Sequence, residues 1–284
     1  MIECEHGSID YDECGAGPTV VLVPGSCSTG AAWRSVISEW GNCFRSITTS
    51  LLGYGRTAER RTMLDADISH EAESLEAVIR RAACPVHLAG HSFGSLVALA
   101  VALRDKVPLL SLTIIEAPAA GLLRHWGEHQ HYRAFREMTD AYCHAFHSGQ
   151  RAAIASMVDF YGGAGTFGSW PQRVRDYAVE MTAVNMLDWT AAYGFQPTSA
   201  SLAAIDIPTL VVRGADSHPA VKRANEVLTL SMPKSSLVTM AGASHFMLAT
   251  HPQQLGRLVA EQVRDAELLH QQHHTGIKHV HVQF

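Results

Sequence analysis

Residues 86–97 read Val-His-Leu-Ala-Gly-His-Ser-Phe-Gly-Ser-Leu-Val, so that an apolar segment leads through Gly-His-Ser-Phe-Gly into a second apolar segment. The pattern G-x-S-x-G between a strand and a helix is typical of a nucleophile elbow. In such a turn the backbone of the central residue, here Ser92, is strained and its hydroxyl is exposed. Glycines on either side let the strand and the helix pass close to the turn. The first amides of the helix point to where an oxyanion would form. The stretch therefore predicts a serine nucleophile, provided that other parts of the chain supply its partners.

The composition is typical of a globular protein with a full core. Of 284 residues, 47% are hydrophobic and 17% are charged, and the formal net charge is −5. Nucleic acid is not expected as a partner because there is no long basic run. A membrane is not expected either, since no apolar run reaches the ~18 residues of a membrane span. The acidic N-terminus lacks the pattern of a signal peptide, and the six cysteines include no C-x-x-C pair. We therefore expect a cytoplasmic monomer or homodimer with free thiols, no metal and no cofactor.

Strands and helices alternate over most of the chain. Apolar runs at residues 18–23 and 110–115 predict strands that are buried on both faces. Further strands are expected at residues 2–5, 8–13, 43–49, 86–91, 207–214 and 236–240. The first two of these are expected to form an antiparallel hairpin at the sheet edge. The alternation predicts an α/β fold with a doubly wound, mostly parallel sheet of eight strands and helices on both faces. In such sheets, ligands bind beyond the carboxyl ends of the strands.

Residues 119–204 interrupt this alternation. The segment contains helix formers, aromatic residues and histidines but no convincing strand. It is expected to form a helical cap, or lid, inserted after the sixth strand, so that the core comprises residues 1–118 and 205–268. The last helix is expected to end near residue 269. The histidine-rich residues 269–284 are interpreted as a solvated C-terminal tail.

His245 is the candidate general base for Ser92. Serine is a weak nucleophile unless a base lies within hydrogen-bond reach. The chain contains 17 histidines, but His245 lies in a small-residue loop, Gly-Ala-Ser-His at 242–245, directly after the last expected strand. That position predicts that it lies at the same edge of the sheet as Ser92.

Two carboxylates compete to orient the histidine. Such an acid holds the imidazole in one tautomer and stabilises the imidazolium. Asp216 follows the strand at 207–214 and gives the chain order Ser…Asp…His, whereas Glu116 ends the strand at 110–115 and gives Ser…Glu…His. Asp216 also fits an Asx turn or an N-cap, and Glu116 also fits a carboxylate bonded to loop amides. Asp216 is the preferred acid, and Glu116 stays open as the alternative.

Two backbone N–H groups are expected to bind the oxyanion of the substrate. One belongs to Phe93, directly after the nucleophile, and the other to Ser26 in the loop after the strand at 18–23, with Cys27 as the next choice. No motif supports a thiol nucleophile at Cys27. The substrate is expected to lie under the cap, although aromatic residues of a helical lid also form its own core. The candidate pocket residues are Cys27, Trp126, Tyr142 and Trp189.

Taken in order, these motifs resemble the α/β-hydrolase fold superfamily in its capped branch of small hydrolases. The matching segments are Val-Pro-Gly-Ser at 23–26, Leu-Gly-Tyr-Gly-Arg at 52–56, Gly-His-Ser-Phe-Gly at 90–94, Gly-Ala-Asp at 214–216 and Gly-Ala-Ser-His at 242–245. The resemblance implies a Ser-His-acid catalytic triad. Members usually place the acid one residue later than Asp216, where Ser217 stands, and haloalkane dehalogenases of this superfamily use a Glu where Glu116 stands.

A serine at position 92 resembles the carboxylesterases, lactonases, carbon–carbon bond hydrolases and cofactor-free perhydrolases of this superfamily. It argues against haloalkane dehalogenases and epoxide hydrolases, which attack with Asp. The resemblance thus implies an enzyme that hydrolyses a small, largely apolar ester or related acyl compound through an acyl-enzyme. The alternatives are a ligand-binding signalling protein of the same fold with little turnover and a cofactor-free perhydrolase.

Overall fold

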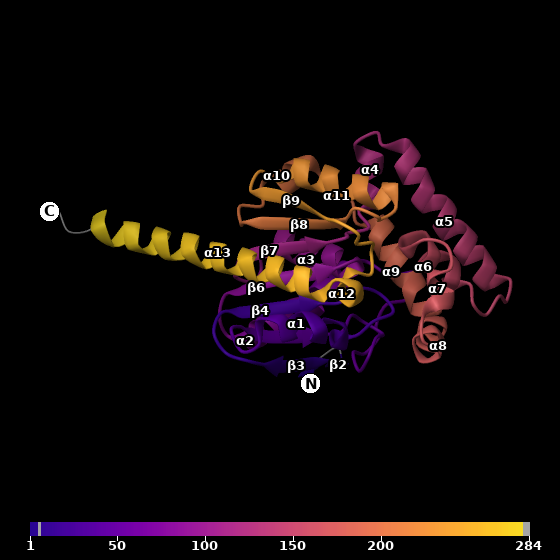
Figure 1. The fold of residues 1–284 in the computed structure, drawn as a ribbon, viewed down its shortest axis with the longest axis horizontal. Coiled ribbons are helices and arrows are strands. Elements are labelled where there is room, and N and C mark those ends of the chain that lie inside the picture. Colours follow the sequence, from indigo (N-terminus) through magenta and orange to yellow (C-terminus); the bar gives the residue numbers. More distant parts are fainter. Residues whose placement is uncertain (5–6, 281–284) are drawn as a thin grey trace.

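Seven strands form one sheet at the centre of the molecule (Figure 1). The computed structural model describes residues 1–4 and 7–280. The strand order across the sheet is β3 (Tyr11–Cys14), β5 (Arg45–Thr49), β4 (Thr19–Val23), β6 (Val86–His91), β7 (Leu109–Ile115), β8 (Thr209–Gly214) and β9 (Ser235–Met240). β3 is antiparallel to β5, and all other neighbours in this sheet are parallel. The predicted α/β class with a mostly parallel sheet is confirmed.

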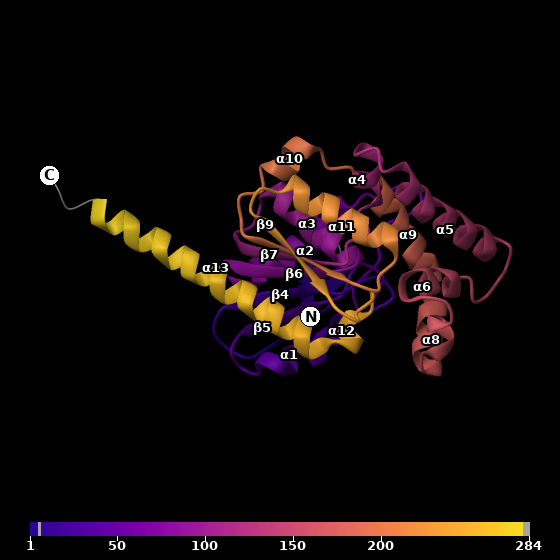
Figure 2. The ribbon, with the colours of Figure 1, turned by 45° about the horizontal axis from the view of Figure 1, so that its top comes forward.

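Helices cover both faces of the sheet (Figures 1 and 2). One face is covered by α1 (Arg34–Trp40) and α13 (Pro252–Val280), and the other by α2 (Ser69–Ala82), α3 (Phe93–Arg104) and α11 (Pro219–Ser231). Strand β4 shows how the two cores arise, because Val20 and Leu22 join the core on the α1 side while Val21 and Val23 join the other. With both faces buried, the strand is apolar throughout, which is the feature that predicted it.

The N-terminal hairpin lies outside the main sheet. β1 (Ile2–Cys4) pairs with β2 (Gly7–Ile9) in a separate two-stranded sheet, so the expected count of eight strands is wrong. Asp10 separates this hairpin from β3. Its N–H donates to Thr57 Oγ1 at 3.0 Å, and its carboxylate accepts from Ser50 Oγ at 3.0 Å. These bonds break the strand that was expected to be continuous over residues 8–13.

Seven helices lie between β7 and β8 in the described chain, and most of them gather at one side of the sheet (Figure 1). Because β1 and β2 pair separately, this segment follows the fifth strand of the main sheet and not the expected sixth. The helices are α4 (Ala120–His125), α5 (His129–His147), α6 (Ile154–Gly162), α7 (Thr166–Ser169), α8 (Gln172–Glu180), α9 (Thr182–Gly194) and α10 (Ser199–Ala203).

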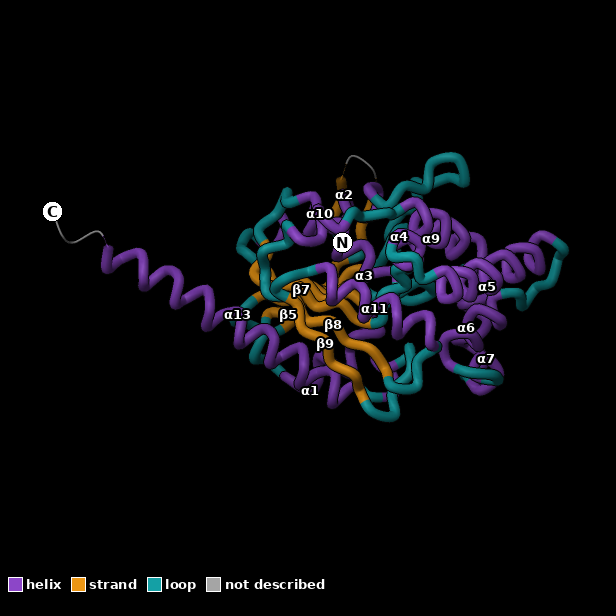
Figure 3. Tube along the Cα trace, turned by 90° about the horizontal axis from the view of Figure 1, so that it is seen from above, coloured by secondary structure: helices purple, strands orange, loops and turns teal. Residues whose placement is uncertain are grey.

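α13 continues to Val280, so the expected helix end near residue 269 is wrong. No proline follows Pro252, and each further residue of a growing helix adds a backbone hydrogen bond. Figures 1 and 3 show the C-terminal part of α13 projecting away from the body of the molecule. Residues 281–284 of the expected tail lie outside the described residues. No helix in the described part of the chain is long and apolar enough to cross a membrane.

Candidate active site

Ser92 lies at the sharp turn between β6 and α3. Its φ of 54° and ψ of −127° are rare for a residue with a side chain. A Cβ on residue 90 would lie 2.4 Å from the carbonyl oxygen of Gly94, and a Cβ on residue 94 would lie 2.2 Å from the carbonyl oxygen of Pro24. Both glycines are therefore required because β6, α3 and the loop after β4 approach one another closely.

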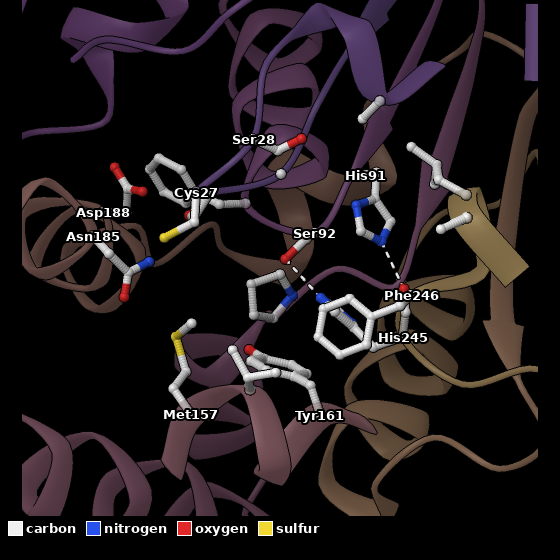
Figure 4. Close-up of a pocket in the computed structure, with 18 of the residues that line it drawn as sticks. Cys27, Ser28, His91, Ser92, Met157, Tyr161, Asn185, Asp188, His245 and Phe246 are labelled. Carbon is white, nitrogen blue, oxygen red and sulfur yellow. Dashed lines mark hydrogen bonds between the residues drawn. The ribbon is translucent and has the colours of Figure 1, made fainter. Parts of the chain in front are cut away.

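Ser92, His245 and Glu116 form a continuous hydrogen-bonded chain. Ser92 Oγ is 2.9 Å from His245 Nε2 (Figure 4), and His245 Nδ1 is 3.1 Å from Glu116 Oε2. All three side chains are buried. A proton on Nδ1, donated to the carboxylate, leaves Nε2 free to accept the proton of the serine hydroxyl. The arrangement can therefore activate the hydroxyl as a nucleophile.

The carboxylate of Glu116 is held by the turn that follows β8. Its Oε1 accepts hydrogen bonds from the Gly214 N–H at 2.7 Å and from the Ser217 hydroxyl at 2.8 Å. Oε2 is left to face His245. The backbone of Glu116 has a φ of 55°, a left-handed conformation that non-glycine residues adopt mainly at functional sites and turns.

Asp216, the acid preferred from the sequence, lies in the same turn but is exposed. Its backbone N–H donates to the carbonyl oxygen of Ala243 at 2.9 Å. The turn directs the neighbouring Ser217 hydroxyl inward instead, onto the carboxylate of Glu116. The preference for Asp216 is therefore wrong on geometry, and the structure places the alternative, Glu116, against His245.

The loop after β4 passes directly over Ser92. A Cβ on residue 25 would lie 2.9 Å from the Cβ of Ser92, so the approach depends on glycine. Cys27, two residues later, has a φ of 53°. Ser26 and Phe93, whose backbone amides are expected to bind the oxyanion, line the same cavity as Ser92.

This cavity has a volume of about 350 Å³ and lies between the sheet and the helices inserted after β7. Ser92 and His245 lie on one wall of it, as Figure 4 shows. Apolar side chains form most of the lining, as in ordinary small-molecule sites. They include Phe93, Met157, Tyr161, Trp170, Trp189 and Phe246.

A sequence model described as the alpha/beta hydrolase family matches residues 20–258, most of the chain. The chain belongs to the alpha/beta hydrolase family. The match includes all three residues of the hydrogen-bonded chain, Ser92, Glu116 and His245. A comparison with curated proteins gave no match.

Solved structures with this fold align with nearly the whole chain. A thermophilic esterase from Thermogutta terrifontis is 21% identical with a TM-score of 0.70, and the alignment covers 93% of this chain and 96% of that one. An enol-lactonase from Burkholderia xenovorans is 16% identical with a TM-score of 0.69, covering 90% and 96%. A meta-cleavage product hydrolase from Pseudomonas fluorescens is 16% identical with a TM-score of 0.66, covering 91% and 94%. At these identities the likeness shows the fold alone.

The ring and loop of His245 are fixed by aromatic neighbours. His91 Nε2 donates to the carbonyl oxygen of His245 at 2.8 Å (Figure 4). Burial, with a smaller contribution from nearby His245, lowers the pKa of His91 to about 3, so its ring is neutral. Tyr161 of α6 stacks on the His245 ring with centroids 4.0 Å apart, and Phe246 packs edge-on against it at 5.4 Å. These contacts keep the imidazole in place beside Ser92.

His91 is expected to make this alpha/beta hydrolase less stable as the pH falls. Buried His91 stays neutral down to its pKa of about 3, whereas in the unfolded chain it takes up a proton below 6.5. The unfolded state thus binds more protons between these values. The free energy of unfolding therefore falls by up to about 1.4 kcal/mol for each pH unit below 6.5.

Urea unfolding of the wild type and of His91→Gln at about pH 7, 6 and 5 measures this contribution. Glutamine can still donate to the His245 carbonyl but has no titrating ring. The difference between the two proteins therefore separates His91 from carboxylates that titrate in the same range. We expect the variant to lose less stability at low pH, and equal losses in both proteins would contradict the prediction.

A buried ionic cluster lies where the loop after β5 meets α2 and α9. Asp188 accepts hydrogen bonds from Arg61 Nη1 at 2.8 Å and from the Tyr54 hydroxyl at 2.6 Å. Arg61, whose side chain is fully buried, also pairs with Glu71 of α2 at 3.1 Å. Burial raises the pKa of Asp188 and raises that of Glu71 to about 7, while Arg61 opposes both shifts. The cluster thus joins the loop after β5 to α2 and α9.

Replacing Arg61 with methionine is expected to lower the free energy of unfolding by about 3–5 kcal/mol, because buried Asp188 and Glu71 lose their counter-charge. Arg56→Met is the matched control. Arg56 is 66% exposed and pairs with Asp10 at the surface, so its loss is expected to cost about 0–1 kcal/mol. Urea unfolding measures both values, and similar losses in the two variants would refute the assignment of a structural role to the cluster.

Two of the four predicted pocket residues line the cavity, namely Cys27 and Trp189. Trp126 lies at the end of α4 and is 39% exposed, outside the lining, and Tyr142 is fully buried within α5. The Tyr142 hydroxyl donates to the carbonyl oxygen of Thr182 at 3.3 Å, which ties α5 to α9. The predictions for Trp126 and Tyr142 are therefore wrong, because aromatic side chains also serve the core and surface of the inserted helices.

α9 contributes two polar residues to the cavity, Asn185 and Asp188, which were not among the predicted pocket residues. With Trp189 they lie three and four residues apart and hence on one face of the helix. The sequence does contain a pattern that could have indicated them, because these two polar residues interrupt an otherwise apolar helix face. The pattern alone does not tell whether that helix face borders a core or a cavity.

Proposed function

We propose that this alpha/beta hydrolase is a serine hydrolase of small, largely apolar esters or related acyl compounds such as lactones. The observation that supports this most strongly is the hydrogen-bonded chain from Ser92 through His245 to Glu116 beside an apolar cavity. Ser92 is the nucleophile, His245 the general base, and Glu116 the acid that orients the imidazole. No cofactor takes part in this mechanism.

Acylation begins when Ser92 Oγ attacks the acyl carbon and its proton passes to His245 Nε2. The carbonyl oxygen becomes an oxyanion, which accepts hydrogen bonds from the backbone N–H groups of Phe93 and Ser26. The bond to the leaving oxygen breaks as His245 returns the proton, so an alcohol leaves and an acyl-enzyme remains. Water, deprotonated by His245, then attacks the acyl carbon. The Ser92 oxygen departs with the proton from His245, and a carboxylic acid is released.

Residues 119–204 act in this proposal as the cap that selects the substrate, over a catalytic core formed by residues 1–118 and 205–268. The apolar lining supplied by α6 and α9 supports an apolar acyl group. The names of the similar structures, an esterase, an enol-lactonase and a meta-cleavage product hydrolase, also support a hydrolase.

Hydrolysis of p-nitrophenyl acetate, butyrate and hexanoate tests the proposal, together with labelling by a fluorophosphonate probe. We expect turnover of at least one ester, and we expect mass spectrometry to find the label on the peptide that contains Ser92. A protein that neither hydrolyses any of these esters nor takes up the label would instead favour the ligand-binding alternative.

A further inference from the structure

Asn185 projects from α9 into the cavity that borders Ser92. It shares one face of the helix with Asp188 and Trp189, which also line the cavity. Figure 4 shows the amide between Cys27 and Met157, with its nitrogen toward the cavity. An amide N–H in this position can donate to an oxygen of a bound molecule.

The amide of Asn185 contributes nothing evident to holding the fold. The residue is only 2% exposed, and its Oδ1 is buried without a hydrogen-bond partner among the described residues. A buried polar atom without a partner destabilises the folded state, whereas a leucine of similar size would not. The amide therefore gives the fold nothing that a leucine would not, and its nitrogen, which Figure 4 shows toward the cavity, is left to donate to a bound molecule.

The charges around the cavity favour a neutral partner for this amide. No lysine or arginine is among the described residues that line the cavity, so a substrate carboxylate would be buried without a counter-charge. Asp188 lies one helical turn from Asn185, but its two oxygens are already engaged by Arg61 and Tyr54. It is therefore not free to bind a cationic substrate.

We propose that Asn185 is the polar anchor of the substrate pocket, so that the preferred substrates are neutral esters whose acyl chain carries a second carbonyl oxygen, as in a ketone or an amide. The inference rests on the proposed serine hydrolase function and narrows its substrate class. The scissile carbonyl binds at Ser92 and the oxyanion amides, the second carbonyl accepts from Asn185 Nδ2, and the remaining chain contacts apolar side chains.

The test compares p-nitrophenyl hexanoate with two oxo esters, p-nitrophenyl 4-oxohexanoate and p-nitrophenyl 5-oxohexanoate. The wild type is expected to show a kcat/KM roughly tenfold higher for at least one oxo ester, as one added hydrogen bond supplies. Asn185→Leu is expected to abolish this preference, so that the ratio of kcat/KM for the oxo esters to that for plain hexanoate falls to about one. Its Tm is expected to rise by roughly 2–4 °C, since an unpartnered polar group is removed.

Asn42→Leu is the matched control, because Asn42 lies in an exposed turn, and it is expected to retain the oxo preference. If Asn185→Leu fails to fold, Asn185→Ala makes the same comparison. A wild type that hydrolyses hexanoate through Ser92 without any oxo preference would overturn the inference and leave the hydrolase proposal standing. An Asn185→Leu protein that still prefers the oxo esters would also overturn the inference. The absence of Ser92-dependent hydrolysis of every ester would overturn the hydrolase proposal, and this inference with it.

Discussion

Ser92→Ala is expected to lower kcat for p-nitrophenyl esters by roughly 10⁶-fold, because the residues of such a triad act as a unit. Without the hydroxyl there is no atom to form the acyl-enzyme, and His245 Nε2 loses the group from which it takes a proton. The residual rate would come from the oxyanion amides and from binding alone. Steady-state kinetics and loss of fluorophosphonate labelling measure the effect together.

Ser148→Ala is the control that tests whether the loss of turnover and labelling is specific to Ser92. Ser148 is exposed at the end of α5, and its replacement is expected to leave both turnover and labelling unchanged. Thermal unfolding of Ser92→Ala checks that its fold is intact. A Ser92→Ala protein that still takes up the probe would show that another residue is the nucleophile.

Glu116→Gln is expected to lower kcat by roughly 10⁴-fold, the loss that follows when the acid behind a catalytic histidine becomes an amide. In the proposed mechanism the carboxylate of Glu116 accepts a hydrogen bond from the Nδ1–H of His245 and stabilises the imidazolium that forms when Ser92 is deprotonated. An amide carries no charge to stabilise the imidazolium and favours the wrong tautomer. The variant is therefore expected to bind substrate normally and to fail in the chemical step.

Asp216→Asn is the matched control for this variant, since it makes the same carboxylate-to-amide change in an exposed side chain of the turn that follows β8. We expect its kcat to stay within about twofold of the wild type. The opposite pattern, with Asp216→Asn inactive and Glu116→Gln near wild type, would return the role of the acid to Asp216. Single-turnover measurements on both variants separate acylation from substrate binding.

Local patterns in the sequence were sufficient to predict the fold class. Buried parallel strands such as β4 and β8 must be apolar on both faces, so they appear in the sequence as continuous runs. The positions of Ser92 and His245 could be predicted for the same reason. Each lies in a loop directly after a recognisable strand, and parallel strands bring those loops to one edge of the sheet.

The edges of the fold were predicted less well. Asp10 ends the pairing of the N-terminal hairpin through bonds to Ser50 and Thr57, some 40 residues away in the chain. No pattern within residues 2–14 contains that information. Likewise, the histidine-rich segment after residue 269 has no clear apolar period, yet α13 continues through it to Val280. Once a helix has formed, each further residue adds one backbone hydrogen bond without a new nucleation cost.

The tertiary structure alone decided which carboxylate faces His245 and which residues border the cavity. Glu116 and Asp216 both follow strands that end beside the histidine loop. The choice depends on how the turn at 214–217 points its N–H and hydroxyl groups, and that turn directs Ser217 rather than Asp216 inward. Asn185 likewise differs from a core residue only because its helix face borders a cavity. Strand and helix periods are local properties of the chain and can be predicted from it. The direction of a side chain at a turn, and the empty space next to a helix, arise from contacts between segments distant in sequence.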